Sequence, residues 1–216
     1  MTIDGIDDYG WNSTKEPRSC DILVPEIVAI LGKLNGGNRI LDLGSGNGAL
    51  CYHLHKVGYY VVGIDYDKKG VDISLNQYPE IHFYNYGVGD DPKRLLETES
   101  VFDVVVSTEV IEHLYAPHLL PRYAHAVLRD EGYLVVTTPY HGYAKNFLLS
   151  LFNKWDSHHM PLLYGGHIKF WSRQTLTKLL ENNGFQVLAF SGVGRLSFLW
   201  KGMVLVAKRM SSVEGA

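Results

Sequence analysis

The sequence predicts an α/β fold in which helices cover both faces of a Rossmann-like, mostly parallel sheet. Short apolar runs of strand length alternate along the chain with segments of helical periodicity. The run at 102–108 is apolar almost throughout, as expected for a strand buried on both faces of a parallel sheet. A glycine-rich segment at 44–48 joins the first apolar run directly to a helix, and doubly wound sheets form ligand sites in this way.

Each element follows from its apolar positions and from the residues that end it. Gly58 ends the second helix, Pro92 is a favoured first helical residue, and Ser172 is a candidate cap for the last helix although the acidic partner of a capping box is missing. Helices are therefore expected at 25–34, 50–57, 68–76, from 92 onward, at 117–128 and at 172–183. Strands are expected at 39–43, 59–65, 81–86, 102–108, 133–138, 185–191 and 199–208.

The glycine loop is compatible with two classes of ligand. Gly44, Gly46 and Ala49 also match the dinucleotide fingerprint, so the glycines alone do not choose between them. Asp42 places a carboxylate two residues before the first glycine, where it would repel a pyrophosphate but not an ammonium or a sulfonium group. A capped aspartate in another nucleotide fold is the alternative.

The segment 42–48 resembles the first motif of the class I S-adenosylmethionine (SAM)-dependent methyltransferases. That resemblance extends from about residue 25 to residue 208 and implies a seven-stranded sheet whose last strand is antiparallel. It further implies that SAM, with S-adenosylhomocysteine as product, is held by Asp42, Gly44, Ser45, Gly46, Asn47 and Gly48.

Further cofactor residues are expected at the ends of the next strands. Asp65 ends the second strand about 20 residues after the loop, where a carboxylate accepts hydrogen bonds from ribose hydroxyls, and a helix cap is its alternative role. The resemblance implies that Tyr66 lies against the adenine and that Asp90 or Asp91 meets the adenine amino group. Either aspartate is equally suited to cap the helix that follows. Thr108 and Glu109 are expected near the sulfonium.

A cluster after the fourth strand carries the candidate chemistry. If 109–114 is helical, Glu109, Glu112 and His113 share one face. The pattern resembles ubiquinone-biosynthesis O-methyltransferases and small-RNA 2′-O-methyltransferases, in which it is associated with a divalent cation. The second family adds a histidine that corresponds to His167. Three roles stay open: metal binding by Glu109, Glu112, His113 and His167, general-base catalysis by His113 with Glu112, or positioning alone.

Composition limits the other possibilities. The net charge of −3 provides no overall basic field, so nucleic acid is an unlikely partner. Cys20 and Cys51 form neither a disulfide framework nor a metal knuckle, which fits a cytoplasmic setting. No stretch has the length and hydropathy of a signal peptide or a transmembrane helix, and oligomeric state has no signature.

We expect a single methyltransferase domain over 1–216, with a flexible arm at 1–19 and a lid-like insertion at 140–166. The insertion is rich in aromatic residues and histidines, and its part 145–155 is a candidate for peripheral membrane contact. Within the arm, Arg18 is a candidate partner for the cofactor carboxylate. The expected reaction is methyl transfer from SAM to a hydroxyl of a small or lipid-like acceptor. The alternatives are a catalytically altered SAM-binding protein, a nucleotide-dependent oxidoreductase and an RNA 2′-O-methyltransferase.

Overall fold

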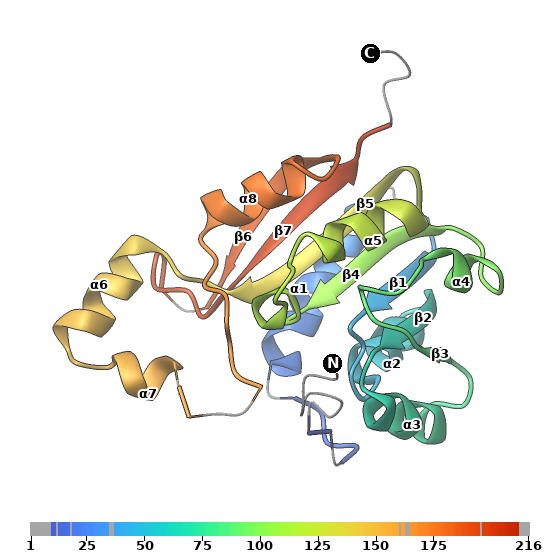
Figure 1. The fold of residues 1–216 in the computed structure, drawn as a ribbon, viewed down its shortest axis with the longest axis horizontal. Coiled ribbons are helices and arrows are strands. Elements are labelled where there is room, and N and C mark those ends of the chain that lie inside the picture. Colours follow the sequence, from blue (N-terminus) through green and yellow to red (C-terminus); the bar gives the residue numbers. More distant parts are fainter. Residues whose placement is uncertain are drawn as a thin grey trace, which may run out of the picture.

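The computed structural model describes residues 10–11, 13–17, 19–34, 37–159, 161–162, 165–194 and 196–211. Its centre is a seven-stranded sheet with the order β3-β2-β1-β4-β5-β7-β6 (Figure 1). Strands β1 to β5 are parallel neighbours, and β7 is antiparallel to both β5 and β6, as expected for this fold class. The strands are β1 Arg39–Leu43, β2 Tyr60–Asp65, β3 His82–Asn85, β4 Phe102–Thr108, β5 Leu128–Pro139, β6 Phe185–Val193 and β7 Gly202–Arg209.

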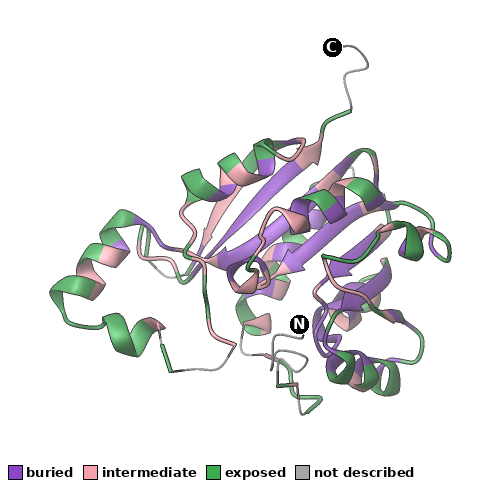
Figure 2. Ribbon diagram, viewed as in Figure 1, coloured by how far each residue is buried: buried purple, intermediate pink, exposed green. Residues whose placement is uncertain are grey.

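Helices pack on both faces of this sheet and bury two apolar clusters, which Figure 2 shows as a buried sheet between helices that are exposed on their outer sides. One face is covered by α1 Cys20–Leu31, α2 Ala49–Lys56 and α3 Lys68–Gln77, the other by α4 Lys93–Leu96, α5 Leu119–Val127 and α8 Arg173–Glu181. Three further elements follow β4 and β5 on the ligand side of the sheet: η1 Ile111–His113, α6 Tyr143–Leu151 and α7 Trp155–His159.

Strand β4 has the predicted bounds, whereas several other boundaries differ for local reasons. The first helix begins at Cys20 rather than at residue 25, because Leu23, Ile27 and Leu31 form a buried stripe with a four-residue spacing. Strand β5 begins at Leu128, where one pair with Phe102 precedes a shift in register. The capping box of α8 is complete, because the hydroxyl of Thr175 takes the place of the missing acidic side chain.

The described part of the insertion after β5, which was expected to be lid-like, contains two helices. Helices α6 and α7 project away from the sheet, at the left of Figure 1. Residues 160, 163 and 164 of this insertion lie outside the described residues, as do 1–9, 12 and 18 of the arm, including Arg18. No helix in the described part of the chain is long and apolar enough to cross a membrane.

Candidate functional site

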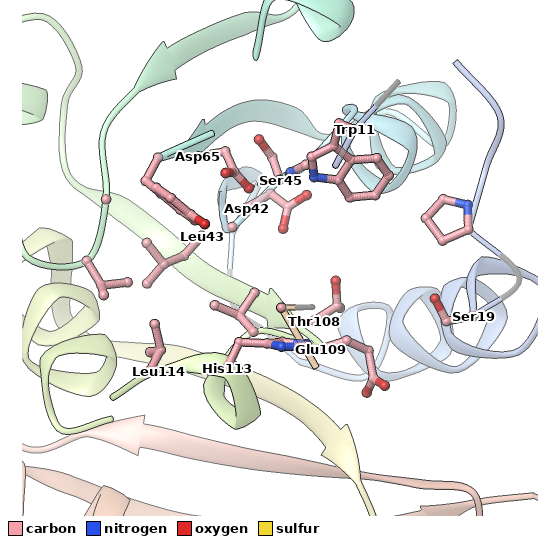
Figure 3. A pocket seen from close by; sticks show the side chains of 18 of the residues that line it. Trp11, Ser19, Asp42, Leu43, Ser45, Asp65, Thr108, Glu109, His113 and Leu114 are labelled. Carbon is pink, nitrogen blue, oxygen red and sulfur yellow. Dashed lines mark hydrogen bonds between the residues drawn. The ribbon is translucent and has the colours of Figure 1, made fainter. Parts of the chain in front are cut away.

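A cavity of about 770 Å³ lies over the carboxyl ends of β1, β2 and β4. Its volume is in the range of small-molecule sites. In Figure 3, Trp11, Asp42, Ser45 and Asp65 lie on one side of this cavity, and Thr108, Glu109, His113 and Leu114 lie on the other. Residues 165–168 also line it. Among the predicted cofactor residues, the cavity is lined by Asp42, Gly44, Ser45, Gly46, Asn47, Asp65, Tyr66, Thr108 and Glu109.

The glycine loop is held tightly against β2 and α3. The amides of Gly44 and Ser45 both donate to the carbonyl of Ile64, at 2.8 and 2.9 Å. Gly44 has a φ of 90°, and a Cβ at this position would lie 2.4 Å from Cγ2 of Val110. Gly48, with a φ of 77°, precedes the first residue of α2. Both positions therefore require glycine for backbone conformation, and Gly44 also for space.

The described part of the arm lies over this loop. The side-chain amide of Asn47 donates to the carbonyls of Ser13 and Lys15, at 3.3 and 3.0 Å. The indole of Trp11 occupies the space where a Cβ on Gly46 would be, with Cζ2 at 2.4 Å from that position. The arm thus covers the loop side of the cavity, and Trp11 is a lining residue that sequence reasoning missed because nothing in its local pattern marks it.

Asp42 is buried at the loop end of β1, with a side chain directed into the cavity (Figure 3). Its Oδ2 accepts a hydrogen bond from the thiol of Cys51, at 3.2 Å, whereas Oδ1 has no partner among the described residues. Burial, with a smaller contribution from the nearby carboxylate of Asp65, raises its pKa from 3.8 to about 7 against the lowering effect of the Cys51 hydrogen bond. A buried carboxylate with one oxygen unpaired among the described residues favours a cationic ligand group.

Asp65, the last residue of β2, binds the glycine loop through its carboxylate and also lines the cavity. Its Oδ2 accepts the amide of Gly46 and its Oδ1 accepts the amide of Asp67, both at 2.8 Å. Burial raises its pKa to about 6 against the lowering effect of these two bonds. The helix cap considered as its alternative role belongs to Asp67, whose side chain accepts from the first amides of α3.

The two aspartates after β3 have different surroundings. Asp90 accepts the amide of Gly87 at 2.8 Å and borders a small hollow beside Tyr66. Asp91 accepts the amide of Lys93 at 3.0 Å, at the start of α4. The helix-start role therefore falls to Asp91, and Asp90 is the aspartate beside the hollow.

Glu109 departs from the expected geometry. The segment after β4 is a single 3₁₀ turn, η1, and Glu109 precedes it with a φ of 54°, so the three acid and histidine side chains do not share a helical face. Its carboxylate accepts the hydroxyl of Thr137 at 3.2 Å and lies in the field of Lys145, while burial raises its pKa to about 7. A left-handed φ at a non-glycine residue is a strained conformation that is typical of functional sites.

Glu112, His113 and His167 do converge, with one potential ligand atom from each within 4.8 Å of the others. Oε1 of Glu112 lies 4.0 Å from Nε2 of His113 and 4.0 Å from Nε2 of His167. Glu109, which was expected as a further ligand, is not in this group because its side chain turns toward Thr137.

Backbone contacts hold this group in place. The amides of Ile168 and Lys169 both donate to the carbonyl of Glu112, at 3.0 Å, and thereby dock His167 beside η1. The hydroxyl of Thr138 donates to Oε2 of Glu112 at 3.0 Å, which leaves Oε1 buried and without a hydrogen-bond partner among the described residues. Burial lowers the pKa of His113, so its imidazole is predominantly neutral near pH 7.

The family follows from a comparison with known proteins. A family model described as a methyltransferase domain matches residues 16–189. The chain belongs to the methyltransferase domain family. It is a class I SAM-dependent methyltransferase, and its relatives include O-methyltransferases of the ubiquinone-biosynthesis type.

Among curated relatives, the methyltransferase is 31% identical over 168 residues to the mitochondrial ubiquinone biosynthesis O-methyltransferase of Rattus norvegicus, which corresponds to 75% of this chain and 48% of that protein. It is 26% identical over 162 residues to the ubiquinone biosynthesis O-methyltransferase of Bradyrhizobium diazoefficiens, 73% of this chain and 62% of that protein. The chain thus spans about half to two thirds of the length of these relatives.

Solved structures share the fold at low identity. Magnesium protoporphyrin IX methyltransferase from Synechocystis PCC 6803 with bound SAH has a TM-score of 0.61 at 18% identity, covering 92% of this methyltransferase and 90% of that chain. The [4+2]-cyclase SpnF has a TM-score of 0.67 at 15% identity, covering 95% and 88%. Since one of these neighbours is named as a cyclase, likeness of fold alone does not define the reaction.

Proposed function

We propose that this methyltransferase transfers the SAM methyl group to a hydroxyl of a small or lipid-like acceptor. The observation that supports this most is the convergence of Glu112, His113 and His167 beside the cavity. Such a group suits activation of an oxygen acceptor, which otherwise ionises poorly at neutral pH. The names of the two curated relatives described above, both O-methyltransferases, agree with an oxygen acceptor.

In this proposal one end of the cavity binds SAM, and the other, the acceptor end beside Glu112, His113 and His167, binds the methyl acceptor. The cationic amino-acid end of SAM meets Asp42, the ribose meets Asp65, and the adenine lies toward Tyr66 and Asp90. Thr108 and Glu109, at the end of β4, border the reacting region. The loop residues Gly44, Ser45, Gly46, Asn47 and Gly48 shape the space for the methionine part.

A divalent cation fits the residues at the acceptor end. Glu112 offers a buried oxygen that has no hydrogen bond within the described part of the chain, and the two histidines offer imidazole nitrogens. Two imidazoles and one carboxylate form a donor set that suits Fe, Mn or Zn better than Mg, and Thr138 orients the carboxylate from behind. When bound, such an ion lowers the pKa of a hydroxyl that it contacts.

Residues of this chain position the acceptor oxygen relative to the methyl group of SAM. Holding the acceptor oxygen in line with the methyl–sulfur bond converts the encounter into a step within one complex. The imidazole of His113 is suited to accept the hydroxyl proton, with or without an ion, because burial lowers its pKa and keeps it unprotonated near pH 7. We propose that the insertion at 140–166 acts as a lid, since His159 and Pro161 already line the cavity.

A methyl-transfer screen tests the proposal. Purified protein is incubated with methyl-labelled SAM and with phenolic, lipid and RNA pools, with and without a chelator. We expect label in an ether linkage on a phenolic or lipid hydroxyl, and loss of activity in Glu112→Gln and His167→Ala. The matched controls, Glu80→Gln and His55→Ala, replace an exposed glutamate and a half-buried histidine of α2, both outside the converging group and outside the insertion.

Different results overturn different parts. Label on nitrogen or carbon would contradict the hydroxyl acceptor, and transfer to RNA alone would replace the small acceptor by a nucleic acid. Full activity in chelator, together with full activity of His167→Ala, would remove the ion and leave His113 as the base. The SAM affinity of each variant, measured separately, distinguishes loss of chemistry from loss of the cofactor site.

A further inference from the structure

Charge is distributed very unevenly along this chain. Residues 132–216 contain nine lysines and arginines but only three acids, a net charge of +6, whereas residues 1–131 contain eleven basic and twenty acidic residues, a net charge of −9. The overall value of −3 hides this division. A charge asymmetry of this size between two parts of a chain indicates an anionic partner for the basic part.

The basic part carries a helix whose apolar face points outward. On α6, Tyr143, Phe147 and Leu151 follow one another at four-residue spacing and are 86%, 53% and 61% exposed. Phe152 and Trp155 continue this exposed row into α7. The first acidic residue after Tyr140 is Asp156, which follows Trp155. Figure 2 shows the projecting α6 and α7 as largely exposed.

The opposite side of α6 is polar where it meets the body. Lys145 is buried, and its ammonium donates to the carbonyl of Tyr140 at 2.9 Å and to that of Lys201 at 3.5 Å. The usual arrangement of a surface helix is therefore reversed, because a lysine anchors the helix while aromatic and aliphatic side chains face solvent. Exposed apolar rows of this kind mark sites of contact with another molecule or a membrane.

A second exposed apolar segment lies at the base of α6. Leu196 and Phe198 of the loop before β7 are both exposed, and the same loop leads to Lys201, whose carbonyl accepts from Lys145 and from the amide of Tyr140. In Figure 1 this loop lies beside the base of α6. Lys201 and Lys154 add exposed positive charge to these two segments.

We propose that the face formed by Tyr143, Phe147, Leu151, Phe152, Trp155, Leu196 and Phe198 docks on a lipid bilayer that contains anionic lipids. Aromatic and aliphatic side chains enter the boundary between headgroups and acyl chains, while Lys154 and Lys201 remain at the headgroups. A bilayer fits better than a nucleic acid, because bases and phosphates would leave most of this apolar surface without a partner. His159 at the end of α7, Pro161 and residues 165–168 line the cavity, so docking brings this end of the cavity close to the membrane.

Vesicle co-sedimentation tests the proposal without reference to activity. The protein is mixed with vesicles of phosphatidylcholine alone and of phosphatidylcholine with phosphatidylglycerol, at low and high salt. We expect stronger partition onto the anionic vesicles, weakened by salt. The double variant Phe147→Asp/Leu151→Asp should lower partition by about ten-fold or more, because two apolar anchors become charged. Lys154→Glu/Lys201→Glu should remove only the preference for anionic lipid.

The matched control is Leu75→Asp on α3, where a similarly exposed leucine lies on a helix remote from α6 along the chain. It should partition like the unmodified protein, and all variants should retain SAM binding and the melting temperature. Failure of the unmodified protein to bind either vesicle overturns the proposal. So does equal loss in Leu75→Asp, binding to RNA in place of vesicles, or a dimer that the double variant dissociates without any vesicle binding.

Discussion

Replacing Asp42 by asparagine should stabilise the protein and weaken its hold on SAM. The carboxyl is buried beside the cavity, and its pKa is raised from 3.8 to about 7. Since one pKa unit corresponds to about 1.4 kcal/mol, ionising Asp42 near pH 7.5 reduces the free energy of unfolding by up to about 4 kcal/mol. The amide oxygen of asparagine can still accept the thiol hydrogen bond of Cys51, so Asp42→Asn removes this penalty and little else.

The dependence on pH has a definite sign. A group whose pKa is raised on folding contributes stability at low pH and loses it as the pH rises from about 4 through about 7. The advantage of Asp42→Asn in thermal or urea unfolding should therefore be largest above pH 7 and should vanish near about pH 4.

Asp103→Asn is a control for which the opposite change in the free energy of unfolding is expected. Asp103 binds Arg129 and the amides of Asn38 and Arg39, and these contacts lower its pKa, so its replacement should destabilise the protein at neutral pH. If Asp42→Asn also destabilises the empty protein above pH 7, or binds SAM as tightly as the unmodified protein does, the reasoning is refuted.

Three further predictions concern the loop, the ribose acid and a helix cap. Gly44→Ala should reduce SAM affinity by more than about ten-fold in calorimetry, because its φ of 90° disfavours alanine and its Cβ would meet Val110 at 2.4 Å; normal affinity would contradict the loop geometry. Asp65→Asn should weaken SAM binding. The carboxylate accepts the backbone amides of Gly46 and Asp67, and asparagine has only one side-chain oxygen, so one amide loses its acceptor at a cost of about 1–3 kcal/mol. An unchanged dissociation constant for SAM would contradict a role of Asp65 in the cofactor site. Ser172→Ala should lower the free energy of unfolding by about 1 kcal/mol and leave SAM affinity unchanged, and a stability equal to that of the unmodified protein would show that the cap contributes nothing.

The sheet and the cofactor end of the cavity were predictable from sequence because local patterns determine them. An apolar run such as 102–108 has only one favourable place, the centre of a sheet, and β4 has those bounds. The acid at the end of β1 and the glycines after it lie together in the chain, so their proximity needs no knowledge of the fold. Asp65 follows from the same βαβ unit.

The geometry of the acceptor end was not predictable from sequence, because it depends on contacts between distant segments and on the backbone φ of one residue, Glu109. The left-handed φ of Glu109 turns its carboxylate to Thr137 and removes it from the group of Glu112, an outcome that helical spacing did not anticipate. Thr138 orients Glu112 from a neighbouring strand, and Cys51 donates to Asp42 from the following helix; both residues are ordinary core residues in their local patterns. Such partners are identified only when the strands are paired.

The measurement that tests the account most directly is the proton release that accompanies SAM binding. Near pH 6, before SAM is added, the carboxyl of Asp42 should be mostly protonated, and a cationic ligand beside it should drive ionisation. Titration calorimetry in two buffers of different ionisation enthalpy should detect roughly 0.9 proton more for the unmodified protein than for Asp42→Asn. Equal proton release by the two proteins, or tight binding of NAD in place of SAM, would contradict the assignment of this carboxylate as the group that selects the cofactor.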